Sequence, residues 1–337
     1  MYKRQWWKYA LGLLIILLII PVIVYLTKLD WSKQHTQRIN ALPEFDHTGD
    51  GAYRIKVKDK VFRTRISGWN NDGPAAILLH GFPESSAMWA PLMKKAAKKG
   101  YRVIAFDQRG YSPGARPKGK EYYHVDSLVQ DVIGIADYLN LDTFHLVGHD
   151  WGSGVGWRTV MEHPNRIHTW TAMSVAHIGV FFDAVLNDPE QKEKSAYMLK
   201  LRWPILPELL AINFQNVIYD ELEKRWGVGQ VDEYKAIQSE PGAMTAMLNW
   251  YRALDYEDPT VMEQINKKIN RPTLFLWGNE DPIIAHHVVP RQAEYVDTTF
   301  QSVELDAGHS LMQETESEVI DLIIGHWESH APLEIKN

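Results

Sequence analysis

Gly148-His149-Asp150-Trp151-Gly152 lies between an apolar run at residues 144–148, interrupted only by a histidine, and a segment of small residues with helical spacing that begins at residue 153. The two glycines that flank the central residues permit a sharp turn and a close approach of the following helix. The pattern predicts a nucleophile elbow, a strand–turn–helix motif that presents one reactive side chain at the edge of an α/β sheet. In most such elbows that residue is a serine, and here it is Asp150.

The aspartate at this turn predicts a particular reaction class. A serine attacks a carbonyl carbon and forms an acyl ester, whereas a carboxylate can attack a saturated carbon and form an alkyl ester. An alternative is that Asp150 only caps the helix, because aspartate is a favoured N-cap residue. Capping does not explain glycine at both 148 and 152, so we interpret Asp150 as the nucleophile.

Two downstream residues complete a predicted catalytic triad. His309 follows the last predicted strand and would act as general base for a water that attacks the ester, because its pKa lies near neutral pH. Asp281 follows the seventh predicted strand and would orient the histidine and stabilise its cation. Glu280 and Asp255 are alternatives for this acid. The chain order of nucleophile, acid and histidine is that of triads built on such an elbow.

A turn after the third predicted strand offers one half of an oxyanion hole. The segment His80-Gly81-Phe82-Pro83-Glu84 stands where the first backbone donor is expected. The N–H groups of Phe82 and Trp151 would donate hydrogen bonds to the carbonyl oxygen of the alkyl ester. Taken alone, this segment is a turn with a proline breaker.

A literal Gly-x-Ser-x-Gly motif at residues 110–114 provides a competing nucleophile, Ser112. The preceding predicted strand ends near Asp107, and residues 115–119 show no apolar helical period. This context is typical of a loop, not of an elbow. A serine esterase that acts through Ser112 remains an alternative.

Apolar and alternating runs predict an α/β fold with a mostly parallel eight-stranded sheet. The predicted strands are 53–57, 61–66, 75–80, 102–106, 143–147, 169–175, 273–277 and 301–305, of which the first two form a hairpin. From residue 75 onward helical patterns alternate with strands, at 86–99, 125–139, 153–162, 286–295 and 316–328. This alternation places helices on both faces of the sheet.

The segment between the sixth and seventh predicted strands is much longer than a crossover needs. Helical spacing with interspersed prolines predicts an inserted helical cap at residues 181–254. The flanking segments, 45–180 and 255–330, would then form one α/β core. The cap would lie over the carboxyl ends of the strands, where open α/β sheets carry their sites.

The composition excludes several classes of function. The 337 residues carry a formal net charge of -6 and no basic stripe, so nucleic acid is not expected as a partner. The absence of cysteine excludes disulfides, thiolate metal sites and a cysteine nucleophile. We expect no metal and no cofactor, and the sequence predicts no oligomeric state.

An uncharged run from Ala10 to Leu26 follows three basic residues at positions 3, 4 and 8. As a helix it would be about 25 Å long, within the usual range for a membrane span. We expect a single-pass anchor within residues 1–30 and therefore a lipid bilayer as partner. A cleaved signal peptide and a buried helix are the alternatives, but no small-x-small cleavage site follows. The charge of the short tail favours the tail inside and the catalytic domain outside.

Four motifs occur in a characteristic order between about residues 50 and 330: His80-Gly81-Phe82-Pro83-Glu84-Ser85, Asp107-Gln108-Arg109-Gly110-Tyr111-Ser112, Gly148-His149-Asp150-Trp151-Gly152 and Gly308-His309. Together they resemble the α/β-hydrolase superfamily and, within it, the soluble epoxide hydrolases and their bacterial relatives. The resemblance implies a cofactor-independent hydrolase in which Asp150 opens an epoxide. His309, with Asp281, would then activate water to release a diol.

The resemblance also implies two cap tyrosines that donate hydrogen bonds to the epoxide oxygen. Asn249-Trp250-Tyr251-Arg252 is similar to the second tyrosine motif and nominates Tyr251, and Ser195-Ala196-Tyr197-Met198-Leu199 is similar to the first and nominates Tyr197. Simple packing on a cap helix is the alternative for each. The family further implies an aromatic cleft for a small apolar substrate, lined by Phe82, Trp89, Trp151 and Trp250.

Other members of the superfamily fit less well. Haloalkane dehalogenases share the aspartate but often place a halide-binding asparagine where this chain has Phe82, and fluoroacetate dehalogenases place an arginine where it has Trp151. Ser310 departs from the aromatic residue that relatives often carry after the histidine, which leaves the pocket shape open. A third alternative is a non-catalytic, membrane-tethered binding protein, but the filled triad and tyrosine positions argue against it.

Overall fold

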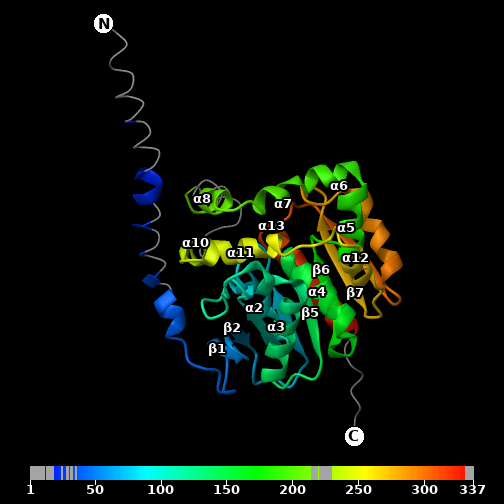
Figure 1. Cartoon of the computed structure of the whole chain (residues 1–337). Helices are drawn as coiled ribbons and strands as arrows, with labels where there is room; N and C mark the ends of the chain where they lie inside the picture. The colour runs from blue at the N-terminus through cyan, green and yellow to red at the C-terminus, as the bar shows by residue number, and fades with distance from the viewer. Residues whose placement is uncertain are drawn as a thin grey trace.

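The computed structural model describes residues 12, 19–23, 26–27, 30, 33–34, 36–213, 219 and 230–330. One eight-stranded sheet with the strand order β1-β2-β4-β3-β5-β6-β7-β8 organises the chain (Figure 1). The strands are β1 (Gly51–Val57), β2 (Lys60–Ser67), β3 (Ala75–Leu79), β4 (Arg102–Phe106), β5 (Phe144–His149), β6 (Ile167–Met173), β7 (Thr273–Gly278) and β8 (Phe300–Leu305). The predicted eight-stranded α/β sheet is therefore confirmed.

Strand pairing brings the site segments to one edge of the sheet. β1 and β2 form the predicted antiparallel hairpin, β2 pairs antiparallel with β4, and β3 to β8 are parallel. In the centre, Leu79 of β3 is the register partner of Gly148 of β5. The loops that follow these strands therefore begin side by side. Both strands are buried along their whole length, as is typical of a parallel sheet covered on both faces.

Helices cover both faces of the sheet and produce two apolar layers. On β3, Ile77 packs with one buried cluster while Leu78 packs with the other, as alternating side chains require. Residues of α3 (Val125–Tyr138) and α4 (Trp151–Glu162) belong to the first cluster, and residues of α2 (Ala90–Lys98) and α14 (Glu316–Ser329) belong to the second. The short elements are η2 (Ser86–Trp89), η3 (Lys120–Tyr123), η4 (Pro164–Arg166), η5 (His286–Tyr295) and α13 (Leu311–Glu314).

The long segment between β6 and β7 is helical where it is described. Its helices are α5 (Ile178–Asn187), α6 (Pro189–Lys194), α7 (Ala196–Leu201), α8 (Leu206–Asn213), α10 (Gln230–Ser239), α11 (Ala243–Arg252) and α12 (Pro259–Ile265). Figure 1 shows α6, α7, α8, α10 and α11 gathered at one end of the molecule. Of these helices, α7 and α11 reach the edge of the sheet at which β5 ends, because Tyr197 and Tyr251 line one cavity with Asp150.

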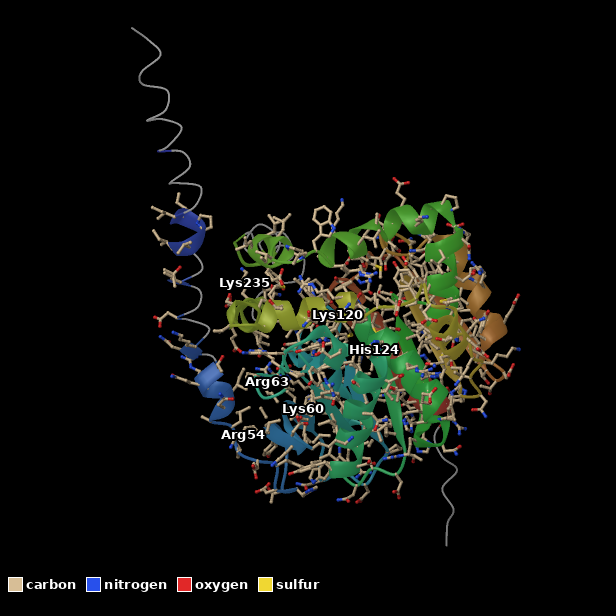
Figure 2. All side chains as sticks on the ribbon, viewed as in Figure 1. Arg54, Lys60, Arg63, Lys120, His124 and Lys235 are labelled. Atoms are coloured by element: carbon tan, nitrogen blue, oxygen red, sulfur yellow. The ribbon has the colours of Figure 1, made fainter. Side chains whose placement is uncertain are left out.

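Ion pairs connect α10 to the sheet. Glu233 pairs with Arg63 and Arg65 of β2, and Glu240, just beyond the helix, pairs with Arg116. Arg63 is buried and also contacts Asp107 at 2.6 Å, and it lies on the sheet side of α10 in Figure 2. Buried pairs of this kind fix the position of a helix, because separating them would leave charges without partners.

The anchor predicted within residues 1–30 falls mostly outside the described residues. Within the described part of the chain, no helix combines the length and the apolar character needed to cross a membrane. The structure therefore gives the membrane prediction no support.

Candidate active site

Asp150 lies at a sharp turn between β5 and α4. Its backbone has φ 52° and ψ −118°, a conformation that residues with a side chain rarely adopt. A Cβ atom on Gly152 would lie 2.2 Å from the carbonyl oxygen of Leu79, and one on Gly148 would lie 2.3 Å from the carbonyl oxygen of Gly152. Both glycines are thus required by close backbone contact, and the predicted elbow is confirmed.

The Asp150 side chain does not cap α4. It makes no capping hydrogen bond, although the residue occupies the N-cap position. Instead, Oδ1 accepts a hydrogen bond of 2.7 Å from the N–H of Phe82. The capping interpretation is therefore wrong, and the carboxylate faces the loop after β3.

His309 lies between the two predicted carboxylates. Its Nε2 is 3.4 Å from Asp150 Oδ2, and its Nδ1 is 2.8 Å from Asp281 Oδ2. The other oxygen of Asp281 accepts a 2.7 Å hydrogen bond from the N–H of Ile283, which orients the carboxylate. Glu280, the competing acid, is exposed, and Asp255 is exposed as well. The structure thus brings Asp150, Asp281 and His309 together.

The charges of this cluster stabilise one another. Burial lowers the pKa of His309, but the carboxylates of Asp281 and Asp150 outweigh burial and raise that pKa well above its ordinary value of 6.5. Burial raises the pKa of Asp150, but the hydrogen bond and charge of His309 outweigh burial and lower it. Asp150 is therefore an ionised carboxylate next to an imidazolium.

The two predicted oxyanion donors are the N–H of Phe82, in the loop after β3, and the N–H of Trp151, which directly follows Asp150. The N–H of Phe82 already contacts the carboxylate. Trp151 is the first residue of α4, where backbone N–H groups have no partner within the helix and attract negative charge. The site thus offers the N–H of Phe82, which contacts the Asp150 carboxylate, and the N–H of Trp151 at the N-terminus of α4.

A buried Glu84–His149 pair supports the loop that carries His309. His149 Nδ1 is 2.9 Å from Glu84 Oε2, and its Nε2 is 2.9 Å from the carbonyl oxygen of His309. Ser174 donates to the same carbonyl oxygen, and Gln313 donates to Glu84. Because both partners of His149 are acceptors, the ring must carry both protons to satisfy them.

The electrostatics of this pair agree with its geometry. Burial lowers the pKa of His149, but the charge of Glu84 outweighs burial and raises it. Both residues lie within the sequence motifs at 80–85 and 148–152, but neither was predicted to have a role. The register of β3 with β5 brings these positions together, and no spacing along the chain signals the pairing.

Tyr197 of α7 and Tyr251 of α11 line the same cavity as Asp150. Their ring centroids are 6.4 Å apart. The Tyr251 ring packs edge-to-face against Trp151 at 4.9 Å and against Phe82 at 5.5 Å. Burial raises the pKa of both tyrosines, so both phenols stay protonated and can donate hydrogen bonds.

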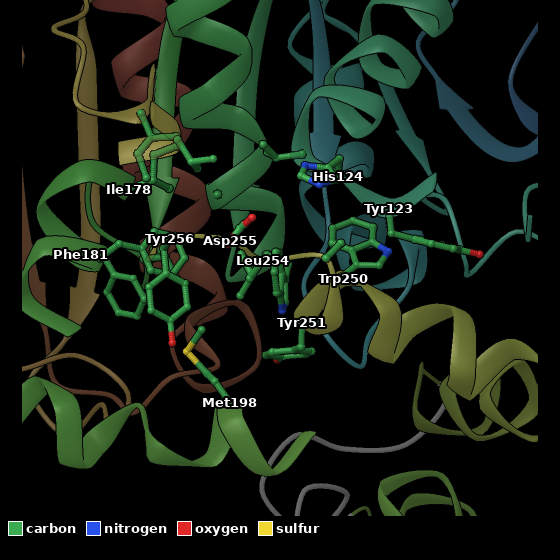
Figure 3. Close-up of a pocket in the computed structure, with 18 of the residues that line it drawn as sticks. Tyr123, His124, Ile178, Phe181, Met198, Trp250, Tyr251, Leu254, Asp255 and Tyr256 are labelled. Carbon is green, nitrogen blue, oxygen red and sulfur yellow. The ribbon is translucent and has the colours of Figure 1, made fainter. Parts of the chain in front are cut away.

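The cavity is lined almost entirely by apolar and aromatic side chains. It comprises about 880 Å³ when its solvent-open part is included. Figure 3 shows Phe181, Tyr256 and Met198 on one side of Tyr251 and Trp250 on the other. Such a lining favours an apolar ligand with few polar groups.

Two of the residues predicted to line this cavity, Phe82 and Trp89, are not among its lining residues. Trp89 does not line it, because the side chain is fully buried with Met88 and Leu92 in the cluster on the other face of the sheet. Ser112 is also fully buried: it donates to the carbonyl oxygen of Asp107 at 2.7 Å and accepts from the N–H of Arg63 at 2.9 Å. Both bonds fix a loop, so the alternative of a Ser112 nucleophile is wrong.

Within the described part of the chain, no three histidine, cysteine, aspartate or glutamate side chains converge in a way that could hold a metal ion. The chemistry available at the site is that of a carboxylate, an imidazole–carboxylate pair, two phenols and backbone donors.

Residues 74–314 match the family model of the α/β hydrolase fold. The chain belongs to the α/β-hydrolase family. Among curated α/β-hydrolases it is 32% identical to the AB hydrolase superfamily protein YfhM of Bacillus subtilis, over 75% of this chain and 90% of that protein. It is 31% identical to Epoxide hydrolase A of Mycobacterium tuberculosis, over 73% of this chain and 88% of that protein.

Solved structures agree with this α/β-hydrolase assignment. The chain matches an epoxide hydrolase of Bacillus megaterium in complex with an inhibitor with a TM-score of 0.70 and 23% identity, over 82% of this chain and 99% of that one. At this identity the likeness concerns the fold. The named relatives identify the chain as an epoxide hydrolase-like enzyme, and the likeness of the fold agrees with this.

Proposed function

We propose that the protein hydrolyses an apolar epoxide to a diol through an aspartyl ester at Asp150. The observation that carries the proposal is the juxtaposition of an ionised Asp150, an imidazole 3.4 Å from it and two protonated phenols around one apolar cavity. An ionised carboxylate is the form that attacks carbon, and a protonated phenol is the form that assists a leaving oxygen.

In the first step an Asp150 oxygen forms a bond to a ring carbon while the carbon–oxygen bond of the epoxide breaks. Tyr197 and Tyr251 donate hydrogen bonds to the departing oxygen, and one of them transfers its proton to it. The result is a hydroxyalkyl ester of Asp150 and one tyrosinate. Esterification removes the negative charge of Asp150, so His309 loses one of the two groups that raise its pKa and passes its proton to the tyrosinate.

In the second step His309 takes a proton from water, and the resulting hydroxide attacks the ester carbonyl carbon. The N–H groups of Phe82 and Trp151 stabilise the oxyanion. When the intermediate collapses, the carboxyl proton passes to the departing alkoxide and completes the diol. His309 keeps the proton taken from water, and the enzyme is restored with Asp150 ionised, His309 as an imidazolium and both tyrosines protonated. The sum is one epoxide and one water converted to one diol.

Isotope labelling tests the proposal. Single turnover of an epoxide in heavy-oxygen water should place the label in the Asp150 carboxylate, and later turnovers should transfer it to the diol. The same reaction in Asp150→Ala should give no product. Diol formation by that variant, or label that enters the diol directly in the first turnover, would refute the ester route.

Two features of organisation belong to the same proposal. Residues 181–254 serve as a cap that carries both tyrosines over the core formed by residues 45–180 and 255–330. The uncharged run from Ala10 to Leu26 serves as a lipid anchor that holds the catalytic domain on the outer face. Alkaline carbonate extraction and protease accessibility in cells test the anchor and its orientation. Release of the full chain by carbonate would contradict it.

A further inference from the structure

Exposed large apolar side chains concentrate in two segments of the described chain. Five lie within residues 19–26, and six lie on or next to α7 and α8, with 46% to 69% of each of these six exposed. We name the second group the α7–α8 face: Leu199, Trp203, Ile205, Leu206, Leu209 and Leu210. Single exposed apolar residues are ordinary in soluble proteins, but a local group of this kind indicates an interaction surface.

The backbone between the two helices presents apolar residues outward. Ile205 has φ 67°, a conformation that is rare for a β-branched residue, and its side chain is 69% exposed. The preceding Trp203 is 56% exposed. The turn therefore places an isoleucine and a tryptophan outside the core, where burial cannot stabilise them within the described chain.

The charges around the face match a lipid surface. Lys200 of α7 is exposed next to Leu199 in sequence, although the whole chain is acidic, whereas the neighbouring helix α6 carries exposed Glu190 and Glu193 as well as exposed Lys192. The acid of α8, Glu208, turns toward Arg252 of α11 at 2.8 Å and so leaves the face without a negative charge of its own. Leucine, isoleucine and tryptophan next to a basic residue are typical of helices that lie at a membrane interface and contact anionic headgroups.

The other exposed apolar segment agrees with the same occupant. Residues 19–23 are level with α8 in Figure 1. They belong to the uncharged run of the sequence that we propose as an anchor. A bilayer that receives this run would meet the α7–α8 face at the same level.

We propose that the α7–α8 face docks on the surface of an anionic lipid bilayer and inserts its apolar side chains at the headgroup boundary. Helix α7 contributes Tyr197 and Met198 to the cavity, and its next residue, Leu199, is exposed on the α7–α8 face. An extension, which rests on the proposed function, is that the substrates are apolar epoxides dissolved in the membrane. Docking itself is independent of catalysis.

Single-cysteine labelling tests docking directly, because the chain contains no native cysteine. Leu210→Cys on the face and Asp142→Cys, an exposed residue before β5 at the opposite edge of the sheet, receive the same environment-sensitive fluorophore. The full chain is reconstituted in phosphatidylcholine–phosphatidylserine vesicles with spin-labelled lipids. We expect at least about five-fold stronger lipid quenching at position 210 than at 142.

Other occupants of the face give different outcomes, and each would overturn the proposal. A fluorophore at 210 that is shielded without vesicles indicates coverage by another segment of the chain, and shielding that rises with protein concentration indicates a second copy. Equal quenching at positions 210 and 142 indicates no docking.

A charge variant tests the extension to membrane-dissolved substrates. Leu206→Glu/Leu210→Glu should lower hydrolysis of a long-chain epoxide in vesicles by about ten-fold and leave hydrolysis of a water-soluble epoxide unchanged. The matched control, Gln301→Glu/Ser302→Glu on exposed positions of β8, should change neither rate. Equal loss on both substrates would refute the extension. If the wild type hydrolyses neither substrate, the proposed function fails while the fluorescence result still decides docking.

Discussion

Nε2 of His309 lies 3.4 Å from Oδ2 of Asp150, close enough for the imidazole to act on a water that attacks an ester of that carboxylate. The distance joins the loop after β8 to the turn after β5. Only the second step of the proposed reaction needs His309 as a base. Mutation of His309 should therefore block ester hydrolysis without blocking ester formation by Asp150.

His309→Gln should form the ester and fail to hydrolyse it. Ring opening needs only the Asp150 carboxylate and the phenols, whereas loss of a general base slows water attack by roughly 10²–10⁴-fold. Intact-protein mass spectrometry should therefore show one equivalent of covalent adduct. Asp150→Ala is the control and should show none. An adduct on neither protein would contradict the assignment of His309 to the second step.

Tyr251→Phe should slow ring opening at least ten-fold, about 1.4 kcal/mol of barrier, because the departing oxygen loses a hydrogen-bond donor. Tyr197→Phe should act in the same direction. Rapid-quench measurement of ester formation gives the rate. Tyr256→Phe is the matched control, since Tyr256 lines the same cavity but stacks on Phe182. If Tyr251→Phe leaves the rate unchanged, Tyr251 is not part of the site.

Asp281→Asn should move the pH dependence of ester hydrolysis toward acid. A base acts in its neutral form, so the rate rises as pH rises through the pKa of His309, which Asp281 raises. Removing that carboxylate lowers the pKa, and the rising limb shifts to lower pH. Single-turnover rates between about pH 5 and 10 measure the shift. If the pH dependence of the ester-hydrolysis rate is the same in Asp281→Asn and in the wild type, Asp281 does not raise this pKa.

The same raised pKa has a consequence for stability. A group whose pKa is higher in the folded protein stabilises the fold fully below its unfolded pKa, near 6.5, and loses this contribution as pH rises through the folded pKa. Asp281→Asn should therefore reduce the free energy of unfolding most at acidic pH.

Gly152→Ala should destabilise the fold by about 2–3 kcal/mol, because its Cβ would lie 2.2 Å from the carbonyl oxygen of Leu79. Gly154→Ala on the same helix is the control. Its Cβ would approach only Ile178, at 3.9 Å, and alanine favours a helix by about 0.5–1 kcal/mol. Urea unfolding measures both. Equal stability of the two variants would contradict the close approach of α4 to β3.

The sequence predicted the features that depend on local pattern. The glycines around Asp150 and the buried strand before it predicted the elbow, and the positions of Asp281 and His309 after successive strands predicted their convergence. Contacts that depend on strand register were not predicted. Glu84 meets His149 because β3 and β5 pair. Trp89, the last residue of η2, packs in the buried cluster on the other face of the sheet.

The ion pairs of α10 show the same limit. Arg63 and Glu233 come from a strand and a helix far apart in sequence, and their contact follows from how the helices between β6 and β7 fold back on the sheet. A sequence shows which residues are charged, but the tertiary fold determines which of them form ion pairs. The predicted helix at residues 286–295 is a 3₁₀ helix with Pro290 inside it.

The carboxylates and the imidazole come from loops at one edge of the sheet, whereas both phenols come from helices inserted between β6 and β7. A change in the length or shape of the insertion would therefore alter the lining of the cavity and the positions of both phenols together, while the loops that carry Asp150, Asp281 and His309 keep their geometry. Any redesign of the insertion for a larger or smaller ligand has to preserve the spacing of these two phenols.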